Sequence, residues 1–115
     1  MRWRRLSPCS FAKMWRALLT LSLVSAYTLP PSAGRVSTPS REIIVVGTVH
    51  TPSAQQRREI SELIRAVEPD VVLVELDAER LQRLLEAEAA GGSAYGGELA
   101  EAVTAARACD VPVVL

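Results

Sequence analysis

The fold is decided by the stretch Ile43-Ile-Val-Val-Gly-Thr-Val-His50 and by its counterpart Val71-Val-Leu-Val-Glu-Leu-Asp77. Each opens with an unbroken run of apolar, mostly β-branched residues and ends in polar residues. A third run, Val111-Pro-Val-Val-Leu115, is similar. Runs that are apolar on both faces are typical of central parallel strands covered by helices. We therefore expect three buried strands, at 43–46, 71–76 and 111–115.

The segments between these runs have the apolar spacing of helices. The first connection has a capping-box pattern, a helical repeat and a proline stop; these are Ser53 with Gln56, then Ile60, Leu63, Ile64 and Val67, then Glu68-Pro69-Asp70. The second is broken by glycine pairs, with apolar residues at Leu81, Leu84, Leu85, Leu99, Ala102, Val103 and Ala106. The order strand-helix-strand-helix-helix-strand predicts an α/β fold, a mainly parallel sheet with helical crossovers.

Charge divides the chain into two parts. Residues 1–40 contain six basic side chains and no acid, whereas 41–115 contain seven basic and 13 acidic residues, a net charge of −6. A uniformly basic nucleic-acid binder is therefore not expected. Seventy-five residues bury a limited core, so we expect 41–115 to be the N-terminal part of a larger domain, an incomplete domain on its own.

The basic part has the order of a targeting leader. Arginines and a lysine precede the ten-residue apolar stretch 17–26, which is too short to span a membrane and ends in Val24-Ser25-Ala26, suited to signal peptidase. We expect a signal peptide at about 1–26 that directs the chain into the secretory route. Residues 27–40 are rich in Ser, Thr and Pro and begin with Tyr27, as in a plastid transit extension. A secreted protein and an uncleaved membrane anchor are the alternatives.

Polar residues gather where the predicted strands end. His50, the single histidine, follows the first strand, and Glu75 and Asp77 close the second. Ligands in such sheets lie beyond the carboxyl ends of the strands, so these groups are expected on one rim. Glu98, after Gly96-Gly97, adds a carboxylate from a flexible loop. Imidazole and carboxylates suit a divalent cation such as Zn²⁺ or Mn²⁺, and they also suit direct acid–base catalysis.

Each of these residues also has a structural explanation. Asp77 is placed to cap the following helix, Glu98 to interact favourably with a helix dipole, and His50 to lie on the surface. Glu75, inside an apolar run, is expected to be partly buried and to need a partner. Gly47 either ends a strand or lets a ligand approach the backbone. The sequence lacks a phosphate-binding loop, so no nucleotide is expected.

The same residues carry a resemblance to a known family. The stretches Gly47-Thr-Val-His50 and Glu75-Leu-Asp77, with the later Gly97-Glu98 helix and Val113-Val-Leu115, occur in the order found at the start of the TraB/PrgY domain. This pheromone-shutdown family is related to the Tiki and GumN proteins, and the resemblance covers about 42–115.

The resemblance implies a metal-dependent peptide hydrolase that acts on a peptide or protein. His50, Glu75 and Glu98 match the family's polar positions and would hold Mn²⁺, Co²⁺ or Zn²⁺, with Asp77 and Gly47 in support. Glu98 or Asp77 would act as general base. Family members continue beyond the part matched here, many with membrane segments, so membrane association is also implied. The alternative is a non-catalytic module that binds a peptide, regulates or tethers membranes.

Overall fold

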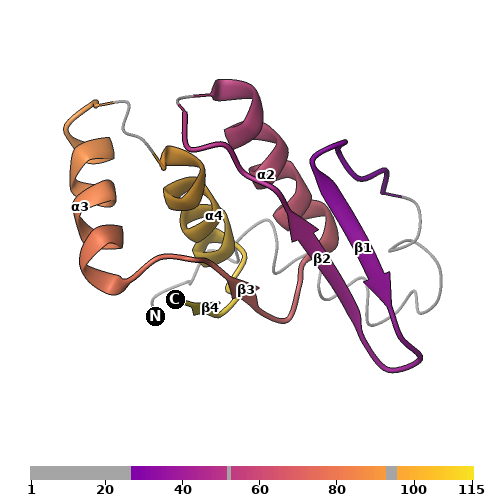
Figure 1. Ribbon diagram of the computed structural model, residues 1–115. Helices are drawn as coiled ribbons and strands as arrows, with labels where there is room; N and C mark the ends of the chain where they lie inside the picture. The colour runs from indigo at the N-terminus through magenta and orange to yellow at the C-terminus, as the bar shows by residue number, and fades with distance from the viewer. Residues whose placement is uncertain (1–26, 52, 93–95) are drawn as a thin grey trace, which may run out of the picture.

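The computed structural model describes residues 27–51, 53–92 and 96–115 (Figure 1). In chain order the elements are β1 (Ala33–Ser37), β2 (Glu42–Val46), α2 (Ala54–Val67), β3 (Val72–Leu73), α3 (Ala78–Ala89), α4 (Gly97–Ala108) and β4 (Val113–Val114). The expected mixed α/β class is thus confirmed. The strands, however, form two separate two-stranded sheets within the described residues.

The last two strands pair as the sequence predicts. Strands β3 and β4 are parallel, with Val72 opposite Val113 and Leu73 opposite Val114. Helices α3 and α4 form the crossover between them, and α4 packs against both strands. Both strands are shorter than expected, because only two residues of each run are paired.

The first predicted strand does not join this sheet, so the expectation of a mainly parallel sheet is not confirmed. Strand β2 pairs instead with β1 in an antiparallel hairpin, with Arg35 opposite Ile44. The turn is closed by Thr38, whose N–H donates to the Arg41 carbonyl at 2.8 Å and whose Oγ1 accepts from the Arg41 N–H at 3.0 Å. Closing a short connection costs little conformational entropy, so strands that are neighbours in the sequence pair readily.

The hairpin includes part of the segment expected as a transit-like extension. Strand β1 lies within 27–40, where no strand is predicted from the sequence. The expected signal peptide, 1–26, lies outside the described residues, so the targeting leader stays a prediction. None of the described helices is both long and apolar enough to cross a membrane.

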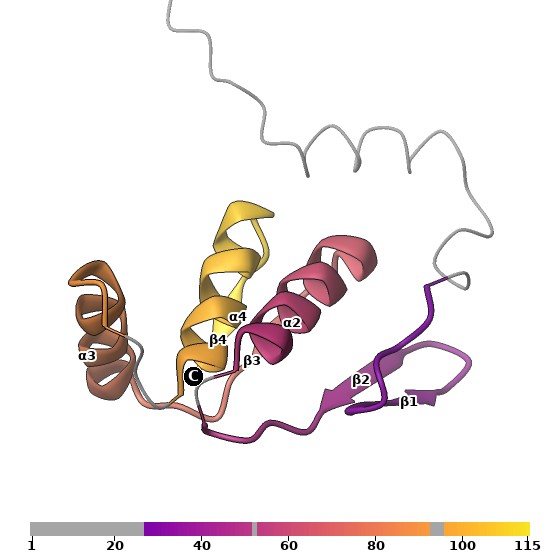
Figure 2. The same cartoon turned by 90° about the horizontal axis from the view of Figure 1, so that it is seen from above.

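The three helices pack side by side and form the core together with Val74, Leu76 and Val111. Viewed from above, α3, α4 and α2 lie in a row, with the hairpin beyond α2 (Figure 2). Val103 of α4 is fully buried, and the predicted apolar positions Ile60, Leu63 and Ile64 of α2 are also buried. Cys109 is 1 % exposed and packs with Ala106 and Val111. The helical periodicity therefore predicted the core-facing positions of α2 and α4.

Local end signals explain where α2 begins and ends. Ser53 caps α2, its Oγ accepting from the Gln56 N–H at 3.2 Å. The helix stops where Glu68 adopts a left-handed conformation with φ 46° and donates its N–H to the Ile64 carbonyl. Pro69 follows at once, as the sequence predicts, because proline disfavours helical backbone in the residue before it.

Candidate functional site

Two of the predicted site residues meet in the structure. His50 Nδ1 lies 2.6 Å from Glu98 Oε1, although the residues are 48 positions apart. A carboxylate oxygen accepts hydrogen bonds, so we assign the ring proton to Nδ1 as the donor in this contact. The other ring nitrogen, Nε2, then carries no proton and can accept one.

The pair has one buried and one exposed member. The Glu98 side chain is 3 % exposed, whereas that of His50 is 64 % exposed. A buried carboxylate is costly unless a partner compensates its charge, and His50 supplies a charge-assisted hydrogen bond. Glu98 also lies in the first turn of α4, where the helix dipole favours negative charge. The buried Glu98 carboxylate is thus a fixed hydrogen-bond acceptor for an imidazole ring that solvent can reach.

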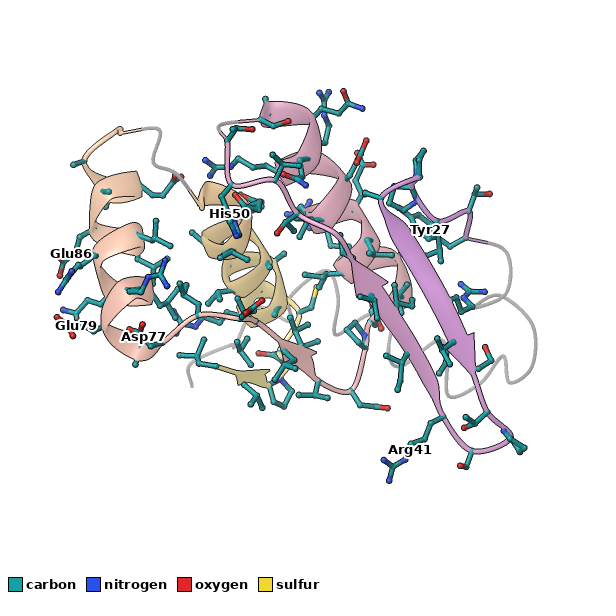
Figure 3. All side chains as sticks on the ribbon, in the orientation of Figure 1. Tyr27, Arg41, His50, Asp77, Glu79 and Glu86 are labelled. Carbon is teal, nitrogen blue, oxygen red and sulfur yellow. The ribbon has the colours of Figure 1, made fainter. Side chains whose placement is uncertain are left out.

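Backbone geometry brings Glu98 to this place. Gly96 precedes α4 with φ 85°, a left-handed conformation that favours glycine, and α4 starts at Gly97. His50 comes from the loop after β2, and Figure 3 shows it beside the first turns of α4. The pair thus joins the end of a strand to the beginning of a helix, as expected for a site beyond strand ends.

Glu75 does not have the surroundings expected for it. The prediction that this carboxylate is partly buried is wrong, because Glu75 is exposed while Val74 and Leu76 on either side are buried. Side chains alternate across an extended chain, and only one face of this segment is covered. Glu75 and Asp77 line an open hollow of about 650 Å³ that includes neither His50 nor Glu98.

Asp77 has the structural role that was the alternative to catalysis. Its carboxylate accepts from the Arg80 N–H at 2.8 Å and so caps α3. In Figure 3, Asp77 lies at the beginning of α3, away from His50. Gly47 donates its N–H to the Ser32 carbonyl at 2.8 Å and so continues the hairpin. A Cβ there would meet the Ser32 oxygen at 3.5 Å, an ordinary contact, so the space does not require glycine.

The Asp77 cap gives a stability prediction. Asp77→Ala is expected to lower the free energy of unfolding by about 1 kcal/mol, because the Arg80 N–H loses its acceptor. Asp77→Asn should change it little, since asparagine caps a helix about as well as aspartate. Urea denaturation followed by circular dichroism measures both variants. Equal losses for Ala and Asn would contradict the capping role.

The expected three-ligand metal site is not assembled by the described residues. Within 27–51, 53–92 and 96–115, no three side chains of His, Cys, Asp or Glu come close enough to hold a metal ion. His50 and Glu98 are two donors in contact with each other. A cation held here would need donors besides these, and the metal site stays a prediction.

A hollow adjoins the loop on both sides of His50. It has a volume of about 320 Å³ and is lined mainly by polar residues. The lining residues are Ser32, Val49, Thr51, Ser53, Gln55, Gln56 and Glu59. Hydroxyl, amide and carboxylate groups can exchange hydrogen bonds with a peptide backbone.

Sequence reasoning missed the contacts that surround the pair. Gln56, oriented by its hydrogen-bonding partners, donates to the Val49 carbonyl at 3.0 Å and accepts from the Val49 N–H at 3.2 Å. Its position in the predicted capping box is half confirmed, because its backbone meets Ser53 while its side chain turns to the His50 loop. The capping pattern was the only signal that singled out Gln56.

An ion network ties the three helices together next to the site. Arg57 donates from Nη1 and Nη2 to both carboxylate oxygens of Glu88, at 2.9 and 2.5 Å, and from Nη2 to Glu101 at 3.4 Å. The hydrogen bond with Glu88 raises the pKa of Arg57 above its ordinary value, with smaller contributions from Glu101. The partners are 31 and 44 positions away in the sequence, so no local pattern could predict them.

Comparison with known proteins gives no relative. No protein family, curated protein or solved structure matches this chain.

Proposed function

We propose that this chain carries the acid–base residues of a TraB-like peptide hydrolase, with His50 moving the proton and Glu98 orienting His50. The observation that carries the proposal is the 2.6 Å contact between His50 Nδ1 and the buried Glu98 carboxylate. A carboxylate that fixes one ring nitrogen and leaves the other facing solvent is the arrangement that acid–base histidines use in hydrolases. The resemblance in the Gly47-Thr-Val-His50 and Gly97-Glu98 stretches supports the peptide as substrate.

The proposed reaction uses the two ring nitrogens differently. His50 Nε2 accepts a proton from water as the water oxygen bonds to the peptide carbonyl carbon. The charged imidazolium is stabilised by Glu98 through Nδ1–H. The proton then passes from Nε2 to the peptide nitrogen, the carbon–nitrogen bond breaks, and a carboxylic acid and an amine leave. Positioned proton transfer of this kind contributes roughly 10² to 10⁴ in rate.

The proposal includes metal dependence because the resemblance to the TraB/PrgY domain implies it. When bound, a divalent cation such as Zn²⁺, Mn²⁺ or Co²⁺ would polarise the substrate carbonyl and acidify water. Because Nε2 accepts the proton in this reaction, a cation that acts beside it would be held by donors other than His50. Glu98 already accepts the hydrogen bond from His50 Nδ1, so it fits better behind His50 than as a ligand. Glu75, exposed and outside the pair, has no role here that its contacts support.

A binding module without turnover is the second candidate. The outward face of the β1–β2 hairpin exposes apolar side chains, with Val36 57 %, Ile43 54 % and Val45 59 % exposed. Val36 and Ile43 are directly opposite each other across the hairpin. An exposed apolar strand surface is a feature of peptide and partner binding.

Peptide turnover by the full 115-residue chain separates the two candidates. The probe is a quenched fluorescent library of short random peptides, incubated with Zn²⁺, Mn²⁺, Co²⁺ or a chelator. Wild type is expected to hydrolyse library members, and His50→Ala should lower the rate by roughly 10² to 10⁴. Thr104→Ala, which changes an exposed side chain of α4, is the matched control.

The hydrolase and the binding module predict opposite results in this assay. Cleavage that depends on His50 supports the hydrolase, and its dependence on cation identity supports metal dependence. Library members that bind wild type without cleavage under every cation condition would overturn the hydrolase and leave the binding module.

A further inference from the structure

The first turn of α2 contacts the loop that carries His50 and the helix that carries Glu98. Gln56 reaches the loop that carries His50, and its neighbour Arg57 reaches α3 and α4, the helix that carries Glu98. These two side chains leave the same helix turn in different directions. Gln56 and Arg57 thus contact the two elements that carry His50 and Glu98, residues 48 positions apart in the sequence.

Gln56 holds the backbone immediately before His50. Its amide exchanges two hydrogen bonds with Val49, one to the carbonyl and one from the N–H. Residues 47–50 belong to no helix or strand. A paired amide therefore fixes the plane of the peptide from which His50 continues, and with it the direction of the imidazole.

Arg57 holds the beginning of α4. It bridges Glu88 of α3 and Glu101, which lies one turn after Glu98 on α4. A Cβ on Gly97 would stand 3.0 Å from Arg57 Nη1 and 3.2 Å from Glu88 Oε1. The guanidinium and its carboxylate thus lie directly against the residue before Glu98. Bidentate arginine–carboxylate pairs are geometrically specific, so this contact restricts where α4 begins.

We infer that Gln56 and Arg57 are positioning residues that hold His50 and Glu98 within hydrogen-bond distance of each other. The inference rests on the proposed function, since it assigns the supporting contacts of that same site. Neither residue touches His50 or Glu98 in any contact that the structure gives. Their effect is on geometry, and losing such a supporting contact costs a site roughly 10 to 100-fold in activity.

The chain provides matched controls for both residues. Gln55 is exposed and, within the part of the chain that the structure describes, donates to Glu59 of the same helix at 2.9 Å; Arg58 is also exposed. We would compare Gln56→Ala with Gln55→Ala and Arg57→Met with Arg58→Met. Each pair changes one residue type at adjacent positions of one helix.

Two readouts are measured on each variant of the full chain. The first is the nitrogen NMR spectrum of the imidazole ring, which reports whether Nδ1 or Nε2 carries the proton; His50 is the only histidine, so the signals need no assignment. The second is turnover of the fluorescent peptide library. Circular dichroism confirms that each variant keeps its helices.

Gln56→Ala and Arg57→Met are expected to lose part of the Nδ1–H signal and to reduce turnover by roughly 10 to 100-fold. Gln55→Ala and Arg58→Met should match wild type. Folded Gln56→Ala and Arg57→Met variants with the wild-type ring spectrum would overturn the inference, whatever their turnover. In a further outcome, wild type cleaves no peptide while the ring spectrum still changes in both variants. That result would overturn the proposed function but would support the positioning role of Gln56 and Arg57.

Discussion

Val103→Asp is expected to unfold the chain. Val103 is 0 % exposed and lies in the core cluster formed by α2, α3, α4 and the segment 74–76 that follows β3. A carboxylate there would be buried without a partner, and removal from water costs several kcal/mol. A domain of this size has only about 3–5 kcal/mol of stability to lose.

Thr104→Asp is the matched control for this prediction. Thr104 is the next residue of α4 and is exposed. Both variants introduce aspartate into the same helix, so helix propensity affects them alike and only burial differs. Far-ultraviolet circular dichroism with thermal melting should show a cooperative transition for Thr104→Asp and none for Val103→Asp. A native-like melt for Val103→Asp would show that α4 does not pack as described.

Glu98→Gln is expected to reduce peptide turnover by roughly 10² to 10⁴ while leaving the fold intact. Glutamine has nearly the same shape as glutamate, so the packing at the beginning of α4 is kept. A neutral amide, however, cannot stabilise the imidazolium that forms on His50. It can also present its NH₂ group to Nδ1, which would move the ring proton to Nε2 and remove the acceptor that takes a proton from water.

Glu86→Gln provides the control for the activity measurement. Glu86 is exposed on α3, and among the described residues its side chain accepts from Gln82 of the same helix at 3.0 Å (Figure 3). Its turnover should equal that of wild type. If Glu98→Gln keeps turnover within about threefold of wild type, Glu98 does not assist the proton transfer that we propose.

The helices were more predictable than the sheets because their signals are local. The Ser53 cap, the repeat from Ile60 and the Pro69 stop all lie within one helix length of sequence. The β-branched run at 43–46 predicts a strand but does not say which strand is its neighbour. Its observed partner, β1, precedes it across the turn Thr38-Pro-Ser-Arg41, which lacks the glycine that marks most tight hairpins.

The candidate site was predictable to the extent that chain geometry determines it. His50 after a strand and Glu98 at a helix start were both selected from the sequence, and the fold brings them together. The apolar run around Glu75 predicts cover on both faces, whereas in the structure this extended segment is covered on one face only, which leaves Glu75 exposed. The supporting contacts of Arg57 could not be predicted, since three helices must pack before its partners are near.

The most direct test of the central claim is the nitrogen NMR spectrum of the His50 ring, recorded at a pH of about 9, where an ordinary imidazole is neutral. Wild type is expected to carry its proton on Nδ1, donated to Glu98. In Glu98→Ala the acceptor is gone, and the proton should move to Nε2, which a free imidazole side chain prefers. The same Nε2–H signal in wild type and in Glu98→Ala would contradict the His50–Glu98 pair and the chemistry that depends on it.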